Sequence, residues 1–169
     1  PAPGGGGPGA REPALVTHGL TVQGPQQGLA MVTGRKLIEN RGWRIPCGWY
    51  ALHVGSQPLA AIGAGWCERM RRAWPDAPPE RSLPSSSIVG LIRVAEQRSP
   101  GQCLPPGHEQ CVWAVGPVCH VIDAAVQLAR PIRHGGSKGL WELSAGALEQ
   151  LRRQLRELPV QSYGPLPRG

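Results

Sequence analysis

The sequence predicts one domain of the mixed α/β (α+β) class, with short strands, three helices and flexible ends. A chain of 169 residues suits a single domain and is long enough to bury a core. Short aliphatic runs typical of strands occur together with amphipathic stretches typical of helices. The 24 glycines and 19 prolines concentrate at the ends, which therefore lack the apolar surface needed for a fixed structure. We place the domain at residues 14–158, between flexible tails at 1–13 and 159–169.

Glycine and proline mark the ends of the first two helices. The first helix is predicted over residues 24–33 and ends at Gly34. The second is predicted over residues 63–74, and Pro75 stops it. Strands are predicted from aliphatic or alternating runs at residues 20–22, 48–54, 88–94, 111–115, 122–128 and 140–143.

A stripe of leucines characterises the third predicted helix, residues 147–158. Leu148, Leu151, Leu155 and Leu158 follow one another at intervals of three, four and three positions, which places them on one face. Four leucines exposed on one stripe would be unusual for a soluble monomer, so we expect this face to be buried. The helix could pack on its own domain or bind a protein partner, and the sequence leaves both alternatives open.

The segment between the first helix and the following strand concentrates charged residues. Lys36, Glu39 and Arg41 lie within six positions. If this segment is extended, Glu39 and Arg41 share one face, and Lys36 can reach it from the turn. Arginine binds planar acceptors through two parallel hydrogen bonds and lysine supplies a mobile charge, so the cluster can hold an anion or a polar heterocycle. The alternative is a surface salt bridge without function.

The flanks of this segment resemble the ASCH domain family, part of the PUA-like group of RNA-binding barrels. The resemblance rests on Gly-x-Lys-x-x-Glu-x-Arg at residues 34–41, on Trp43 after it, and on Lys-Gly-Leu-Trp at 138–141. It extends over about residues 19–143 and implies a small, strongly curved sheet or barrel. Residues 24–27 depart from the family pattern, because they keep its proline but lack the aromatic residue that usually follows.

The resemblance also implies a cleft that binds RNA or a modified nucleotide. A base would stack on a tryptophan there while polar groups read its edge. For His53 and Trp113, structural roles are the alternative. The predicted ligand-binding residues are Lys36, Glu39, Arg41, His53, Trp113 and Lys138.

Two other functions stay open beside binding. In a nucleic-acid-processing hydrolase, either an RNase or a nucleoside amidohydrolase, Glu39 would be the general base and Lys36 would stabilise the developing anion. Some bacterial family members are amidohydrolases of acetylated cytidine, with a lysine and a threonine three positions later. Lys36 matches that lysine, but Glu39 replaces the threonine, so binding is the leading hypothesis. The third alternative is a non-catalytic accessory subunit of a larger assembly.

Charge and cysteine content suggest the partners and the compartment. The net charge of +7 supports contact with phosphate or with an acidic surface. Five cysteines are odd in number and predict free thiols rather than a disulfide framework, as in a reducing intracellular compartment. An organelle reached through a transit peptide that is later removed is the alternative.

No metal site, cofactor or membrane span is expected. The cysteines and histidines between residues 103 and 120 lack the two close ligand pairs that zinc favours. No apolar run reaches the roughly 18 residues that a transmembrane helix requires.

Overall fold

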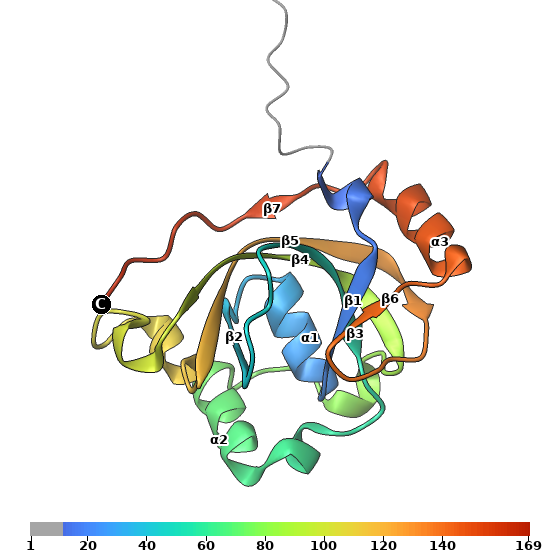
Figure 1. Ribbon diagram of the computed structural model, residues 1–169. Helices are drawn as coiled ribbons and strands as arrows, with labels where there is room; N and C mark the ends of the chain where they lie inside the picture. The colour runs from blue at the N-terminus through green and yellow to red at the C-terminus, as the bar shows by residue number, and fades with distance from the viewer. Residues whose placement is uncertain (1–11) are drawn as a thin grey trace, which may run out of the picture.

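One curled, mixed sheet organises residues 12–169, the part of the chain that the computed structural model describes (Figure 1). Within these residues the strands are β1 (His18–Val22), β2 (Ile38–Arg41), β3 (Gly48–Val54), β4 (Ser87–Arg98), β5 (Val118–Arg133), β6 (Leu140–Glu142) and β7 (Gln161–Ser162). The helices there are α1 (Pro25–Val32), α2 (Ala64–Ala73) and α3 (Ala145–Leu155). The predicted α+β class and curved sheet are confirmed. The predicted tail at 1–13 falls almost entirely outside the described residues.

The strand order explains how the sheet curls. Six strands of the described chain follow the order β2-β5-β4-β3-β1-β6, and β7 pairs with β5. β1 is parallel to β3, and the other pairs are antiparallel. The register shifts at several points along β4, and such irregularities bend strands and increase their twist. The result is a half-barrel.

Helix α1 lies in the hollow of the half-barrel (Figure 1). Its Met31 and Val32 belong to a buried cluster with Leu52 and Ile92 of the sheet. The close approach of helix and sheet depends on Gly90, because a Cβ at this position would lie 2.5 Å from Cγ1 of Val32. Helix α1 therefore fills the barrel interior.

Helix α3 covers the outer face of the sheet (Figure 1). Leu151 is fully buried against a cluster that includes Val126 of β5. The other three leucines of the stripe are half-buried against the same cluster, so the helix packs on its own domain. It begins two residues before the predicted start, because the hydroxyl of Ser144 accepts a hydrogen bond from the amide of Ala147 and caps the helix.

The predicted strand at residues 111–115 is wrong, because the chain there forms the 3-10 helix Glu109–Trp113. The side-chain amide of Gln110 accepts from the Leu37 amide at 2.8 Å and donates to the Arg35 carbonyl at 3.0 Å. Trp113 Nε1 donates to the same carbonyl. These tertiary hydrogen bonds outweigh the weak strand preference of the segment.

The predicted flexible tail at 159–169 is also wrong, because this segment lies along the domain. β7 pairs with β5, and the hydroxyl of Tyr163 donates to the carbonyl of Val32 at 3.1 Å. The buried guanidinium of Arg98 donates to the carbonyls of Leu166 and Pro167, each at 2.8 Å. The segment thus supplies acceptors that a buried charge requires.

We expect that removing residues 160–169 destabilises the domain. Arg98 would lose two acceptors, and an unsatisfied charged donor costs about 2–3 kcal/mol where it stays buried. Thermal unfolding of the shortened chain measures the loss. Arg168→Ala is the control, because the ion pair of Arg168 with Glu96 is exposed and worth less than about 1 kcal/mol. An unchanged melting temperature of the shortened chain would contradict the structural role of the segment.

Candidate functional site

The side chain of Arg41 bridges the open side of the half-barrel. β2, which carries Arg41, pairs with β5 at one end of the strand order, whereas β1 lies near the other end between β3 and β6. Nη2 of Arg41 donates to the backbone carbonyl of Thr21 on β1 at 2.7 Å. Curling of the sheet brings these two strands close enough for a side chain to join them.

Glu39 joins Arg41 to Lys36 in a buried ion network. One carboxylate oxygen accepts from Lys36 Nζ at 2.7 Å, and the other accepts from Arg41 Nε at 3.0 Å. The side chain of Lys36 is 0% exposed, that of Glu39 is 7% exposed and that of Arg41 is 21% exposed. Glu39 and Arg41 thus share one face of β2 as predicted, and Lys36 reaches this face from the segment before the strand.

The network holds Glu39 in its charged form. Burial raises the pKa of the carboxyl, but the charges of Lys36 and Arg41 and their hydrogen bonds outweigh burial and lower the pKa below its ordinary value. Two cations then share one anion. Within the described residues, the ion pairs of Lys36 and of Arg41 are both with Glu39. The network therefore carries one positive charge in excess, and Arg41 is the cation that reaches the surface.

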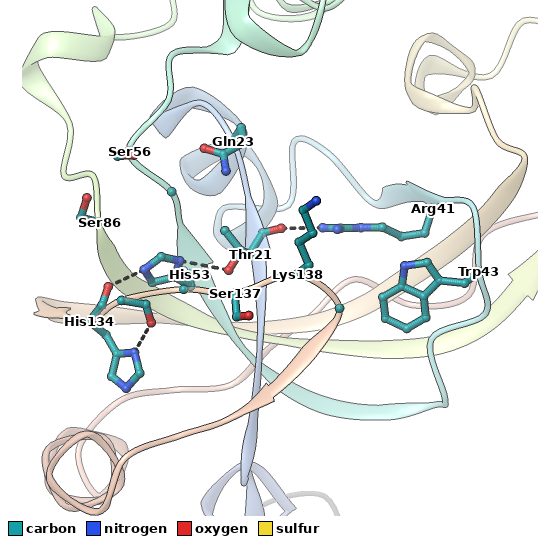
Figure 2. Close-up of a pocket in the computed structure, with 14 residues that line it drawn as sticks. Thr21, Gln23, Arg41, Trp43, His53, Ser56, Ser86, His134, Ser137 and Lys138 are labelled. Carbon is teal, nitrogen blue, oxygen red and sulfur yellow. Dashed lines mark hydrogen bonds between the residues drawn. The ribbon is translucent and has the colours of Figure 1, made fainter.

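Arg41 faces a pocket of about 690 Å³. In Figure 2, Arg41 and Trp43 lie on one side of the pocket, and Ser86 and His134 lie on the opposite side. Lys138 lies between the two sides. Trp43 is 37% exposed, so its ring can be reached from the pocket. The pocket has no aspartate or glutamate among its lining residues, which are Thr21, Gln23, Arg41, Trp43, His53, Gly55, Ser56, Ser86, His134, Gly135, Gly136, Ser137, Lys138 and Gly139.

A directed chain of hydrogen bonds fixes the floor of this pocket (Figure 2). His53 Nε2 lies 2.6 Å from the His134 carbonyl, which can only accept, so Nε2 carries the proton. His53 Nδ1 then accepts from the hydroxyl of Thr21 at 3.2 Å. The same hydroxyl oxygen accepts from Trp141 Nε1 at 3.1 Å. We call Trp141, Thr21 and His53, with the His134 carbonyl, the floor relay.

The floor relay requires a neutral His53. Burial lowers the pKa of this imidazole, the charge of His134 lowers it further, and the hydrogen bond to the His134 carbonyl opposes both. The lowered pKa keeps His53 neutral at pH 7, in the tautomer described above. His53 therefore orients the loop after His134 rather than carrying a charge into the pocket.

A smaller pocket of about 220 Å³ adjoins the first one. The two share Thr21, Gln23 and Arg41 as lining residues. Glu39 and Trp66 line only the smaller pocket. A ligand that touches Arg41 can therefore extend in either direction.

The structure brings three of the predicted site residues together and separates the others. Arg41, His53 and Lys138 line the larger pocket, and Glu39 lines the adjoining one. Lys36 is fully enclosed and lines neither of them.

Trp113 is a core residue, contrary to its predicted role in the cleft. It is 1% exposed and belongs to the cluster beneath α2. Its ring cannot stack on a ligand, because the 3-10 helix Glu109–Trp113 turns it inward.

Sequence reasoning missed Trp43 and Gly136 as site residues. Trp43 follows the charged segment directly, and this position was the available signal. A Cβ at Gly136 would lie 2.5 Å from Thr21 Oγ1 and 2.6 Å from His53 Cε1. Glycine therefore allows the loop to lie against the floor relay, a contact that no local pattern reveals.

The sequence has no match among protein-family models or among curated proteins. In the described chain, no group of three or more His, Cys, Asp and Glu side chains is placed to hold a metal ion. None of the helices in residues 12–169 combines the length and apolar character needed to cross a bilayer.

We expect Glu39→Gln to destabilise the protein strongly at neutral pH. The folded-state pKa of Glu39 lies below its ordinary value of 4.5, so its stabilisation is complete above that value and is lost as pH falls through the folded-state pKa. Glutamine leaves Lys36 buried beside a neutral partner, which costs about 3–5 kcal/mol. Denaturant unfolding measured between neutral and acidic pH tests both the loss and the weaker acid dependence.

Two controls separate this effect from a general effect of removing a carboxylate. Glu149→Gln breaks an exposed ion pair with Arg153 and should cost less than about 1 kcal/mol. Lys36→Met with Glu39→Gln removes both buried partners and should recover part of the loss. Equal stability of Glu39→Gln and the wild type would contradict the role of the network.

We expect Gly136→Ala to displace the loop, whereas Gly135→Ala leaves it in place. A Cβ at Gly135 meets no atom within 4 Å, in contrast to the contacts at Gly136. Forcing a methyl group into a filled space costs about 1–3 kcal/mol. Thermal unfolding and the NMR signals of the His53 ring measure the effect, and identical behaviour of the two variants would contradict the close packing.

Proposed function

We propose that the protein binds RNA or a nucleotide, including a modified nucleotide, in the larger pocket. The observation that carries the proposal is the excess positive charge of the ion network, which Arg41 presents to a pocket without acidic lining residues. Lys138 adds a second cation on the same lining. Arginine and lysine bind phosphate through charge-assisted hydrogen bonds, and a site without a competing carboxylate favours this anion.

The remaining lining supports a nucleotide rather than a bare anion. The exposed ring of Trp43 offers a plane on which a base can stack. Ser56, Ser86 and Ser137 supply hydroxyl groups suited to a sugar and its phosphate. The volume of about 690 Å³ lies within the range of small-molecule sites.

The main chain of the loop that carries Lys138 is accessible to a ligand, which also supports the proposal. Added Cβ atoms at Gly135 and Gly139 would meet nothing within 4 Å, so a ligand can approach the main chain at these positions. Backbone amides at glycines often contact phosphate groups. The run Gly135-Gly136-Ser137-Lys138 thus places a mobile cation beside accessible backbone.

Membership of the ASCH family is part of this proposal. The curled sheet agrees with the curved barrel that the resemblance implies. The Lys, Glu and Arg of the first motif form the ion network at the open side of the half-barrel. The Lys-Gly-Leu-Trp motif supplies Lys138 to the pocket and Trp141 to the floor relay. Both motifs therefore contribute to one site.

The geometry supports hydrolysis less well than binding. Each oxygen of Glu39 accepts from a cation, and the lowered pKa makes this carboxylate a weak general base. Lys36, the other proposed catalytic residue, is fully enclosed. Cleavage of RNA or of an acylated nucleoside by the wild type, lost in a folded Glu39→Gln variant, would reverse this preference.

The accessory-subunit alternative loses one of its supports. The leucine face of α3 packs on the outer sheet of its own domain, so this face is not free for a partner. We further propose a reducing intracellular compartment, because the five cysteines are free thiols. Burial raises the pKa of the Cys103 thiol to about 12, which makes it unreactive.

We expect Lys138→Ala and Trp43→Ala each to weaken binding of short single-stranded RNA or of nucleoside monophosphates. Loss of a stacking plane costs about 1–3 kcal/mol per base, which corresponds to a loss of roughly 5-fold to 150-fold in affinity. Loss of Lys138 should also flatten the salt dependence, since about 0.7 units of slope accompany each single-strand phosphate contact. Fluorescence anisotropy at several salt concentrations measures both effects.

The matched control is Arg44→Ala. Arg44 is exposed and close to Trp43 in sequence, but it does not line the pocket. We expect this variant to bind within about twofold of the wild type, since it removes charge without a pocket contact. Equal losses in all three variants would indicate nonspecific attraction and contradict a site in this pocket.

A further inference from the structure

Helix α2 joins the proposed ligand site to a second hollow lined by arginine. Near its start, Trp66 lines the smaller pocket that shares Arg41 with the larger one. Near its end, Arg72 lines a hollow of about 460 Å³ together with Arg35. The helix has 10 residues and is therefore about 15 Å long. The hollows thus follow one another along a single helix.

A cation lies over an aromatic ring near each end of this helix. The guanidinium of Arg69 lies 6.0 Å from the centre of the Trp66 ring. The guanidinium of Arg35 lies 4.4 Å from the centre of the Trp74 ring. Trp66 is half-buried, so part of its ring faces solvent, whereas Trp74 is 8% exposed and supports Arg35 from beneath.

The arginines of the second hollow are not neutralised by ion pairs. Arg35 and Arg72 are exposed, and neither takes part in an ion pair of the described residues. Glu109 is the acidic residue of this lining, so positive charge exceeds negative charge there. On the same helix, Arg71 differs because it pairs with Glu68.

We propose that α2 extends the site into a track for single-stranded RNA, in which Arg35 and Arg72 contact phosphates beyond the first nucleotide. The proposal rests on nucleotide binding in the larger pocket. Proteins that bind single strands combine cations along the backbone path with aromatic planes for the bases. Guanidinium planes such as that of Arg35 also stack on bases. An acidic protein surface would match the charges but would not use the partly exposed ring of Trp66.

The test compares ligands of two lengths on the full chain. The probes are an equimolar mixture of the four ribonucleoside 5′-monophosphates and a random-sequence single-stranded RNA of about 12 nucleotides, within the range of single-strand site sizes. The main variant is Arg35→Ala with Arg72→Ala. Arg72→Ala alone avoids any effect of unstacking Arg35 from Trp74. The control is Arg152→Ala with Arg156→Ala, because these exposed arginines lie on or next to α3.

We expect the double variant to bind the monophosphates like the wild type and the longer RNA about tenfold more weakly. The slope of affinity against salt for the longer RNA should fall by about 1.4, at 0.7 per phosphate contact. Arg72→Ala alone should show about half of this fall in slope, and the α3 control should leave both ligands unchanged.

Contrary outcomes separate the track from the pocket. If the wild type binds monophosphates but gains nothing from the longer RNA, or if the variant and the control lose equally, the track is overturned and the pocket stands. If neither ligand binds the wild type, the proposed function itself fails. Binding of the longer RNA without monophosphate binding, weakened in the Arg35 and Arg72 variant, would mean that these arginines bind RNA independently of the pocket. This result overturns both the pocket and the track as its extension.

Discussion

A single carboxylate shared by two cations holds the arginine side chain that bridges the open side of this half-barrel. Glu39 binds Lys36 and Arg41, and Arg41 in turn binds the carbonyl of Thr21 on β1. Among the described strand pairs, β2 is joined to the sheet on one side only, through β5. The hydrogen bond from Arg41 to Thr21 joins its other side to β1. A buried group of two cations and one anion is costly to form, and it is retained here at the place where the sheet does not close with backbone hydrogen bonds. The same imbalance of charge leaves an excess positive charge beside the neighbouring pocket, whose lining has no carboxylate.

Rigidity of the pocket comes from neutral groups rather than from charges. The floor relay connects β1, β3 and the start of β6 through hydrogen bonds whose directions are all determined. The imidazole of His134 stacks on Trp141 at 4.9 Å between ring centres. This contact holds the start of the loop that follows His134 in addition to the hydrogen bonds of the floor relay. A pocket organised in this way loses little conformational freedom when a ligand enters, and preorganisation of this kind favours affinity.

The two faces of the sheet pack against different helices. The inner face packs on α1, and the turn after α1 leads directly into the charged segment. The outer face packs on α3, and the C-terminal segment pairs with β5 along an edge of the sheet before it reaches Arg98. Packing on both faces leaves the end of the half-barrel near Arg41 and α2 open to ligands. The pocket and the proposed track lie at that end.

Local patterns in the sequence were sufficient for the elements and for part of the site. Proline and glycine around α1, and alternation along β2, predicted the helix and the shared face of Glu39 and Arg41. Such patterns report the conformation of a few neighbouring residues, which short-range sterics determine. Arg41, His53 and Lys138 were also identified from sequence as neighbours in one site, through the resemblance.

Burial was decided only by the tertiary structure. Lys36 is enclosed beneath Trp66, and Trp113 is turned into the core by hydrogen bonds to the distant Arg35 carbonyl. The C-terminal segment is ordered because Arg98, more than sixty positions earlier, requires acceptors. Each of these outcomes depends on groups that are far apart in the chain. The free energy of burying a charge or a ring depends on its partners in space. The residues next to it in sequence are therefore not sufficient to predict whether it is buried.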